Sequence, residues 1–242
     1  MDAIRTENLT KKFKDVTAVD GLTLSVGKGE LLSLLGVNGA GKTTTVKMLS
    51  CLTQPTAGDA WLLGKSIKAD TAAVKSLLAV SPQETAVAPG LSVEENLHLM
   101  CGVHGFAKSA WAEKTANMLT LLGLDAVRNK KAGKLSGGQQ RRLSIAMALI
   151  SDPQILFLDE PTLGLDVLAR SDLWDMIRAL KGQITIILTT HYMEEAAALS
   201  DRIAIMKDGK LLLCGTAEEL KKAAGTDDFE QAFIRIVKEV AK

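Results

Sequence analysis

Residues 36–43 read Gly-Val-Asn-Gly-Ala-Gly-Lys-Thr, and the chain changes character on either side of them. Before them, Glu30 to Leu35 form an almost continuous apolar run, which predicts a strand buried on both faces of a parallel sheet. After them, Lys42 to Leu49 predict a helix. A glycine-rich turn between such a strand and such a helix points its backbone N–H groups at one anion, and the helix dipole favours the same negative charge. The sequence therefore predicts an α/β fold with a phosphate-binding loop.

Each position of this loop is a candidate contact of a nucleotide. Lys42 would reach the β- and γ-phosphates, and the hydroxyl of Thr43 would bind Mg²⁺. The alternative, an ordinary glycine-rich turn, does not explain why a buried strand and a helix flank the loop. The predicted nucleotide contacts in this segment are Gly36, Val37, Asn38, Gly39, Ala40, Gly41, Lys42, Thr43 and Thr44.

A second apolar run, Gln154 to Leu158, ends in Asp159 and Glu160. Open α/β sheets bind ligands at the carboxyl ends of their strands, and the turn past a strand end can bring neighbouring carboxylates to one site. We expect Asp159 to bind Mg²⁺, directly or through water, and Glu160 to act as the base for an attacking water. A surface acidic pair that merely follows a core strand is the alternative, and the phosphate-binding loop makes it the weaker one.

A second glycine pair lies in Leu135-Ser136-Gly137-Gly138-Gln139, directly before a predicted helix from Gln139 to Ile150. Together with the phosphate-binding loop and the acidic strand end, this segment resembles the signature of the ABC-type ATPases, the nucleotide-binding components of ATP-binding-cassette systems. The similarity covers roughly residues 1–220, with the motifs in the family's order. In that family the signature of one subunit closes over the γ-phosphate held by the other. The resemblance therefore implies two ATP molecules in a head-to-tail dimer, contacted by Ser136, Gly137, Gly138 and Gln139.

The resemblance also assigns roles to four further residues. Gln83, in Val80-Ser-Pro-Gln, matches the family's glutamine loop, which contacts Mg²⁺ or water. His191, which follows the apolar strand Ile184 to Leu188, resembles the switch histidine that touches the γ-phosphate. Asp166 matches a loop that crosses the dimer interface, and capping a helix over residues 167–180 is compatible with that role. Phe13 matches the aromatic residue that stacks on adenine, usually Tyr, and a core or edge Phe is the competing interpretation.

Composition limits the partners of the chain. The net charge of +1 over 242 residues argues against nucleic-acid binding. No stretch reaches the roughly 18–20 continuous apolar residues of a membrane span, and the first residues, Met-Asp-Ala-Ile-Arg, hold no apolar signal region. Three scattered cysteines fit a reducing cytosol. We therefore expect a cytoplasmic chain that reaches the inner or plasma membrane only through a partner.

The order of the motifs predicts one ABC ATPase domain over residues 1–220. We expect a P-loop NTPase with a RecA-like mixed-sheet core (about 28–82 and 152–214), a small antiparallel β subdomain (about 1–27 and 58–64, with a turn at Asp20-Gly21) and an inserted α-helical subdomain (about 84–150). A helical tail follows over residues 216–242. Its apolar residues recur at helical spacing from Asp227 to about Val240, which predicts an amphipathic helix that packs on the core or contacts a partner.

Two departures from the wider family indicate a branch. The tail is too short for the regulatory domain of many sugar importers, and residues 129–133 lack the acidic loop typical of exporters whose membrane domain is fused to the ATPase. Residues 159–166, 190–195 and 204–210 resemble the bacterial branch that serves drugs, sodium, heme, lipids or polysaccharides. That branch pairs a stand-alone ATPase with a separate integral-membrane permease. The resemblance implies such a permease, contacted around residues 84–97, and a homodimer or a pair of related ATPase subunits.

The leading hypothesis is an ATPase subunit that uses ATP and Mg²⁺ to power transport, most simply export, through the permease. A non-transport ABC ATPase that acts on a soluble assembly is the alternative, although the second cassette or long coiled coil usual in such proteins is absent from this sequence. A nucleotide sensor without catalysis is a third class. It requires a lost base or signature, whereas Glu160, Gln83, His191 and Ser136 are all present.

Overall fold

A computed structural model describes residues 2–239 of the chain. Two sheets form its centre: a six-stranded sheet in the order β10-β9-β3-β8-β7-β6 and a four-stranded sheet in the order β2-β1-β4-β5. The neighbours from β9 to β6 in the larger sheet are parallel, and β10 joins its edge antiparallel to β9. The smaller sheet is antiparallel throughout. This is the mixed core with a small antiparallel sheet that the sequence predicts, so the expected fold class is confirmed.

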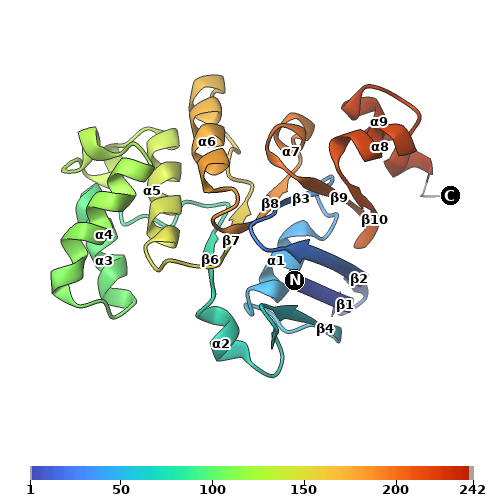
Figure 1. The fold of residues 1–242 in the computed structure, drawn as a ribbon, viewed down its shortest axis with the longest axis horizontal. Helices are drawn as coiled ribbons and strands as arrows, with labels where there is room; N and C mark the ends of the chain where they lie inside the picture. The colour runs from blue at the N-terminus through green and yellow to red at the C-terminus, as the bar shows by residue number, and fades with distance from the viewer. Residues whose placement is uncertain (1, 240–242) are drawn as a thin grey trace.

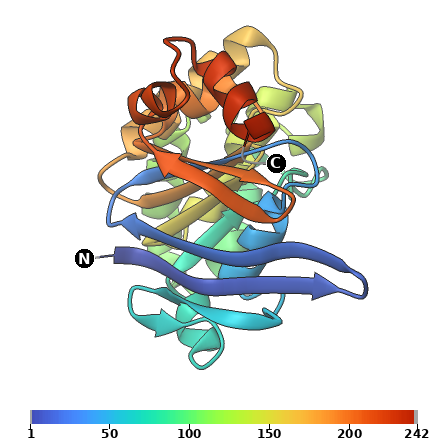
Figure 2. The ribbon, with the colours of Figure 1, turned by 90° about the vertical axis from the view of Figure 1, so that its right-hand side faces the viewer.

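The strands of the larger sheet are β3 (Leu31–Leu35), β6 (Leu78–Ser81), β7 (Ile155–Asp159), β8 (Thr185–Thr190), β9 (Arg202–Lys207) and β10 (Lys210–Gly215). Those of the smaller sheet are β1 (Asp2–Phe13), β2 (Val16–Gly27), β4 (Ala57–Leu62) and β5 (Lys65–Ser66). Figure 2 shows the long β1–β2 hairpin lying between β4 and the six-stranded sheet.

Helices surround the sheets and gather mainly at two ends of the molecule (Figure 1). The helices α3, α4 and α5 lie together at one end, and α7, α8 and α9 lie near the β9–β10 edge at the other. The helices are α1 (Lys42–Leu49), α2 (Thr71–Lys75), α3 (Val93–Val103), α4 (Lys108–Leu121), α5 (Gly137–Leu149), α6 (Val167–Leu180), α7 (Met193–Leu199), α8 (Ala217–Ala223) and α9 (Phe229–Glu239), with two short 3₁₀ turns at Asp125–Val127 and Ala132–Lys134.

The parallel sheet is buried on both faces, as its apolar strands predict. Successive side chains of a strand point to opposite faces. Leu156 and Leu158 of β7 therefore join a core with α5 and α6, whereas Ile155 and Phe157 join a core with α1 and the smaller sheet. Because both faces are covered, a ligand reaches this sheet only at its strand ends, and the carboxyl ends of β3, β6, β7 and β8 lie at the same edge.

The hairpin turn of the smaller sheet lies elsewhere than the sequence predicts. Asp20-Gly21 do not form the turn, which is at Lys14-Asp15 instead. Gly21 lies inside β2 at a register irregularity, where its positive φ of 62° is accommodated and its N–H donates to Thr10 Oγ1 over 3.0 Å. The Asp-Gly pair therefore marks a bulge rather than a turn.

The amphipathic helix at the end of the chain is present as α9. Ala232 and Ile236 are buried, and Phe229, Phe233 and Val237 pack against the same core, which also contains residues of α7, α8 and β9. Packing on the core thus accounts for the apolar face of α9 as far as the structure describes it. Val240, where the predicted helix ends, lies outside the described residues.

Candidate nucleotide-binding site

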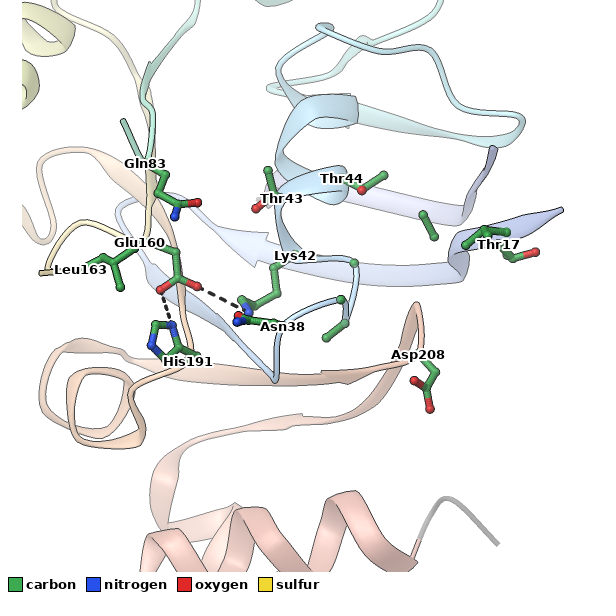
Figure 3. A pocket seen from close by; sticks show the side chains of 15 residues that line it. Thr17, Asn38, Lys42, Thr43, Thr44, Gln83, Glu160, Leu163, His191 and Asp208 are labelled. Atoms are coloured by element: carbon green, nitrogen blue, oxygen red, sulfur yellow. Dashed lines mark hydrogen bonds and ion pairs between the residues drawn. The ribbon is translucent and has the colours of Figure 1, made fainter. Parts of the chain in front are cut away.

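A cleft of about 790 Å³ lies over the carboxyl ends of the parallel strands (Figure 3). Four strands supply it, because β3 leads into the phosphate-binding loop, β6 into Gln83, β7 into Glu160 and β8 into His191. The start of β2 and the turn between β9 and β10 close the other side. The lining residues are Val16, Thr17, Ala18, Asn38, Gly39, Ala40, Gly41, Lys42, Thr43, Thr44, Gln83, Glu160, Leu163, His191 and Asp208.

The glycines of the phosphate-binding loop are required by its geometry. Gly41 has a φ of 100°, and a Cβ added there would lie 2.4 Å from the carbonyl oxygen of Ala18. A Cβ at Gly36 would lie 2.4 Å from the carbonyl oxygen of Met206. The loop therefore packs directly against backbone on both sides, and only glycine fits. Among the described residues no side chain caps the N-terminus of α1, so its first N–H groups face the cleft as an anion site.

Lys42 is buried beneath the loop, with 6% of its side chain exposed. Its Nζ donates to the carbonyl oxygens of Gly36 (2.7 Å) and Val37 (3.3 Å) and lies 3.5 Å from Oε1 of Glu160. Only 9% of the Glu160 side chain is exposed. The cation predicted to bind phosphate and the carboxylate predicted to act as a base thus form a buried ion pair across the cleft (Figure 3).

His191 holds the second oxygen of the same carboxylate. Its Nδ1 lies 2.7 Å from Oε2 of Glu160, and its ring faces the cleft (Figure 3). The backbone of Glu160 is left-handed, with a φ of 49°, and its N–H donates to Thr189 Oγ1 over 3.0 Å. Both carboxylate oxygens and the backbone of Glu160 are therefore held in place, which is the arrangement that a positioned base requires.

The residues predicted to bind Mg²⁺ fit that ion. The hydroxyl of Thr43 donates to Oδ1 of Asp159 over 3.2 Å, and Thr189 Oγ1 donates to the same oxygen. Gln83 lies across the cleft from Thr43 (Figure 3). All three predicted ligands offer oxygen, which Mg²⁺ prefers, and Mg²⁺ at nucleotide sites takes one or two protein groups together with phosphates.

Phe13 lies beside the cleft and does not line it. The residue is 49% exposed at the end of β1, where the ammonium of Lys11 lies 4.9 Å from the centre of its ring. It pairs across the hairpin with Val16, which does line the cleft. The exposure excludes a core role for Phe13, and adenine stacking stays a prediction.

The signature and Asp166 lie outside the cleft of this subunit. Ser136 caps α5: its Oγ accepts from the N–H of Gln139 (3.3 Å), and Gln139 Oε1 accepts from the N–H of Ser136 (3.1 Å). Asp166 likewise caps α6 by accepting from the N–H of Ala169 over 2.8 Å. Ser136 and Gly137 are exposed, whereas Gly138 is buried against Ala169. The structure therefore brings the predicted phosphate, metal and base residues together and leaves the signature facing outward.

Several site residues have no local signal in the sequence. Val16 to Ala18 and Asp208 line the cleft only because the smaller sheet and the β9–β10 turn fold over it. Glu195 is fully buried, Trp174 Nε1 donates to its Oε1 over 3.2 Å, and burial raises the pKa of its carboxyl. Arg141 is 3% exposed and binds backbone carbonyls beside Glu160. Only tertiary contacts identify these residues.

Comparisons with known proteins agree with this geometry. Residues 19–163 match the protein family described as "ABC transporter". The daunorubicin/doxorubicin resistance ATP-binding protein DrrA of Streptomyces peucetius is 39% identical over 226 residues, which cover 93% of this chain and 68% of DrrA. The human phospholipid-transporting ATPase ABCA3 is 41% identical over 226 residues, covering 92% of this chain and 13% of ABCA3. The chain thus spans about two thirds of one relative and a small part of the other.

A solved structure supports the same assignment. The dimeric ATP-binding cassette MJ0796, in a post-hydrolysis state with bound ADP and Pi, superposes with a TM-score of 0.78 at 25% sequence identity. The match covers 88% of this chain and 98% of that one. That protein is a dimer with the products of ATP hydrolysis bound.

Proposed function

The chain belongs to the ABC transporter family, and from this premise we propose that it is an ATP-hydrolysing subunit that powers transport through a separate membrane permease. The observation that carries the proposal is the single cleft in which Lys42, Glu160 and His191 are in contact beside the phosphate-binding loop. The relatives named by function are transport proteins, so action on a soluble assembly is not favoured.

Binding of ATP follows from the charges of the cleft. The N–H groups at the start of α1 and the ammonium of Lys42 would bind the β- and γ-phosphates. Thr43 and Asp159, with Gln83 opposite, would hold Mg²⁺, which neutralises phosphate charge when bound. ATP would also take Lys42 away from Glu160, because the phosphates carry more negative charge than one carboxylate.

Hydrolysis requires a water in line with the γ-phosphate and a group that accepts its proton. Glu160 would accept that proton, since it lies within the cleft and its carboxylate is freed from Lys42 once ATP binds. His191 would orient Glu160 through its contact with Oε2 and would contact the γ-phosphate. Ser136, Gly137, Gly138 and Gln139 of a second subunit would close the site from outside, with Asp166 at the interface.

The printed names of two relatives support a direction of transport and a kind of partner. DrrA is named for resistance to daunorubicin and doxorubicin, and ABCA3 for transport of phospholipid. We infer export of an amphipathic compound by a permease that contacts the surface around residues 84–97. Among residues 2–239 no helix is long and apolar enough to cross a membrane. In this proposal the chain lies on the cytoplasmic face of the membrane and is held there by the permease.

Substitution of the base tests the enzymatic part. Glu160→Gln keeps the size of the side chain and removes its basicity, so steady-state ATP hydrolysis is expected to fall by about a hundredfold or more. ATP binding is expected to persist, because Lys42 and the loop are intact. The ATP-bound dimer should then accumulate, which size-exclusion chromatography with light scattering detects. Hydrolysis close to that of the wild type would remove Glu160 as the base.

A pull-down tests the transporter part. The tagged Glu160→Gln protein, with ATP, is isolated from detergent-solubilised membranes of its own host, and Lys42→Ala serves as the control with weakened ATP binding. Recovery of a multi-span membrane protein in about equal amount supports the proposal. Recovery of soluble proteins alone, with an empty membrane fraction, would favour action on a soluble assembly instead.

A further inference from the structure

Arg141 joins the signature helix to two loops of the cleft. It lies on α5, about one and a half turns after Ser136, and is 3% exposed. Its Nη1 donates to the carbonyl oxygen of Pro82 (2.6 Å), and its Nη2 donates to those of Gln83 (2.8 Å) and Glu160 (2.9 Å). These carbonyls belong to the loops that follow β6 and β7, which are adjacent parallel strands. One guanidinium therefore fixes the backbone of two predicted catalytic residues to one helix.

The burial of this charge is unusual, because an interior cation is unfavourable unless it is paired or fully hydrogen-bonded. Among residues 2–239, no carboxylate lies within ion-pair distance of Arg141. Burial accordingly lowers the pKa of its guanidinium, and the more distant charges of Asp159 and Glu195 act in the opposite direction. Three backbone carbonyl oxygens therefore accept hydrogen bonds from the buried guanidinium. If this position served packing alone, a neutral side chain of similar size would be sufficient.

Arg141 contacts Glu160 at a residue whose backbone conformation is unfavourable. Glu160 is in the left-handed region, which is unfavourable for a residue with a side chain. Its N–H is bound by Thr189 on one side, and its carbonyl oxygen is bound by Arg141 on the other. The position of the carboxylate in the cleft therefore depends on where α5 holds the guanidinium.

We propose that Arg141 is a positioning residue for ATP hydrolysis, which sets the backbone of Gln83 and Glu160 from the helix that begins at the signature. The proposal rests on the proposed function, because it takes Glu160 as the base. Since Ser136 and Arg141 lie on one rigid helix, a shift of the signature against a second subunit would move the base of its own cleft. The guanidinium thus couples the outward-facing signature to the chemistry inside the same subunit.

The test compares Arg141→Gln and Arg141→Lys with the wild type in the full-length chain. Lys keeps the charge and the aliphatic stem but cannot bridge three carbonyls, so it also serves if the Gln variant fails to fold. Both variants are expected to lose about 10- to 100-fold in kcat, the effect of a small displacement of a catalytic group, while KM and the dissociation constant for ATP stay within about threefold. Arg178→Gln, which removes an exposed helical arginine paired with Asp175, should hydrolyse ATP like the wild type.

Two results would overturn the proposal. One is a kcat within about twofold of the wild type for both folded variants. The other is a loss of ATP affinity in proportion to the loss of kcat, with a lowered melting temperature, since that pattern indicates a general structural role.

A double substitution separates a positioning role from an independent one. Single-turnover hydrolysis of radiolabelled ATP is measured for Arg141→Gln, Glu160→Gln and the combination. If Arg141 acts through Glu160, the double variant loses less than the product of the two single losses. Losses that multiply fully would contradict the proposal. If Glu160→Gln hydrolyses ATP like the wild type, Glu160 is not the base, and the inference about Arg141 fails together with that assignment. If Glu160→Gln is inactive but the Arg141 variants hydrolyse ATP like the wild type, only the inference about Arg141 fails.

Discussion

At the scale of single residues, the cleft pairs a buried cation with the carboxylate that we propose as the base. Lys42 and Glu160 lie 3.5 Å apart with little exposure, and His191 holds the other oxygen of the carboxylate. In the proposed function, a bound phosphate would compete for Lys42 and would so free one oxygen of Glu160. ATP binding and activation of the base would then be linked through one ion pair, because each uses the same ammonium group.

Substitution of Lys42 tests this link. Lys42→Ala is expected to weaken ATP binding by at least about tenfold, because a charge-assisted contact with phosphate is lost. Titration calorimetry with ATP on the isolated protein measures the effect. Lys47→Ala, on the exposed side of the same helix, is the matched control and should bind like the wild type. Equal affinities for the two variants would contradict a phosphate contact by Lys42.

Glu195 makes stability depend on pH in a specific direction. Burial raises the pKa of its carboxyl above the ordinary value of 4.5, and the charge of Glu160 acts in the same direction, whereas the hydrogen bond from Trp174 opposes it. The folded state therefore keeps the proton at pH values where the unfolded chain has lost it. The stability that Glu195 contributes is complete below 4.5 and is lost as the pH rises through the folded-state pKa.

Glu195→Gln removes this dependence and keeps an oxygen for Trp174. The variant is expected to have a higher free energy of unfolding than the wild type at pH 8, with a difference that shrinks as the pH falls towards 4.5. Urea unfolding of both proteins at several pH values measures the difference. A gap that stays constant with pH would show that Glu195 is not held protonated by the fold.

Individual site residues were predictable where a local motif carries them. Asp159 ends a buried strand, and Lys42 and His191 come after one, so the strand ends predict where these residues lie. Arg141 and Glu195 have no such signal, because the partners of Arg141 lie 19 to 59 residues away in the chain and that of Glu195 lies 21 away. Trp174, the donor to Glu195, has no local signal either, because this contact also depends on the fold.

At the scale of elements, capping determines where several helices begin. Ser92, Ser136 and Thr216 each form a reciprocal capping box, with Glu95, Gln139 and Glu219 respectively. Each box joins residues three apart in the chain, so these helix starts are encoded locally. The β1–β2 turn was misplaced because Lys14-Asp15 carry no glycine, whereas Gly21, which does, serves a bulge set by contacts with Thr10.

Asp166 combines a cap with a predicted interface role, and two substitutions separate them. Asn caps a helix about as well as Asp, so Asp166→Asn is expected to unfold like the wild type, whereas Asp166→Ala should lose about 1 kcal/mol of unfolding free energy. Urea unfolding measures this difference, and ATP hydrolysis is measured on the same samples. If the charge of Asp166 also acts at the dimer interface, both variants lose activity. Full ATP hydrolysis by Asp166→Asn would show that Asp166 acts only as a helix cap and that its charge has no role at the interface.

At the scale of the whole molecule, the two predicted anion sites of one subunit lie apart. The cleft contains the phosphate-binding loop, and the signature opens to solvent elsewhere on the surface. The two signature glycines differ in their surroundings. A Cβ at Gly138 would lie 2.9 Å from Ala169 Cβ, so this glycine serves the packing of α5 on α6, whereas a Cβ at Gly137 meets only Leu165 at 3.9 Å. The surface at Gly137 is therefore accessible to a group from another molecule.

Mixing two defective variants tests whether that outside group is the ATP of a second subunit. Gly137→Asp fits the folded subunit but places a negative charge where a phosphate would bind, and Lys42→Ala damages the cleft. In a head-to-tail dimer each variant alone has two defective sites, whereas a mixed dimer joins the intact cleft of one subunit to the intact signature of the other. Random pairing then restores up to about a quarter of wild-type ATP hydrolysis. Activity of the mixture no higher than that of the separate variants would mean that the signature does not act on the ATP of a partner.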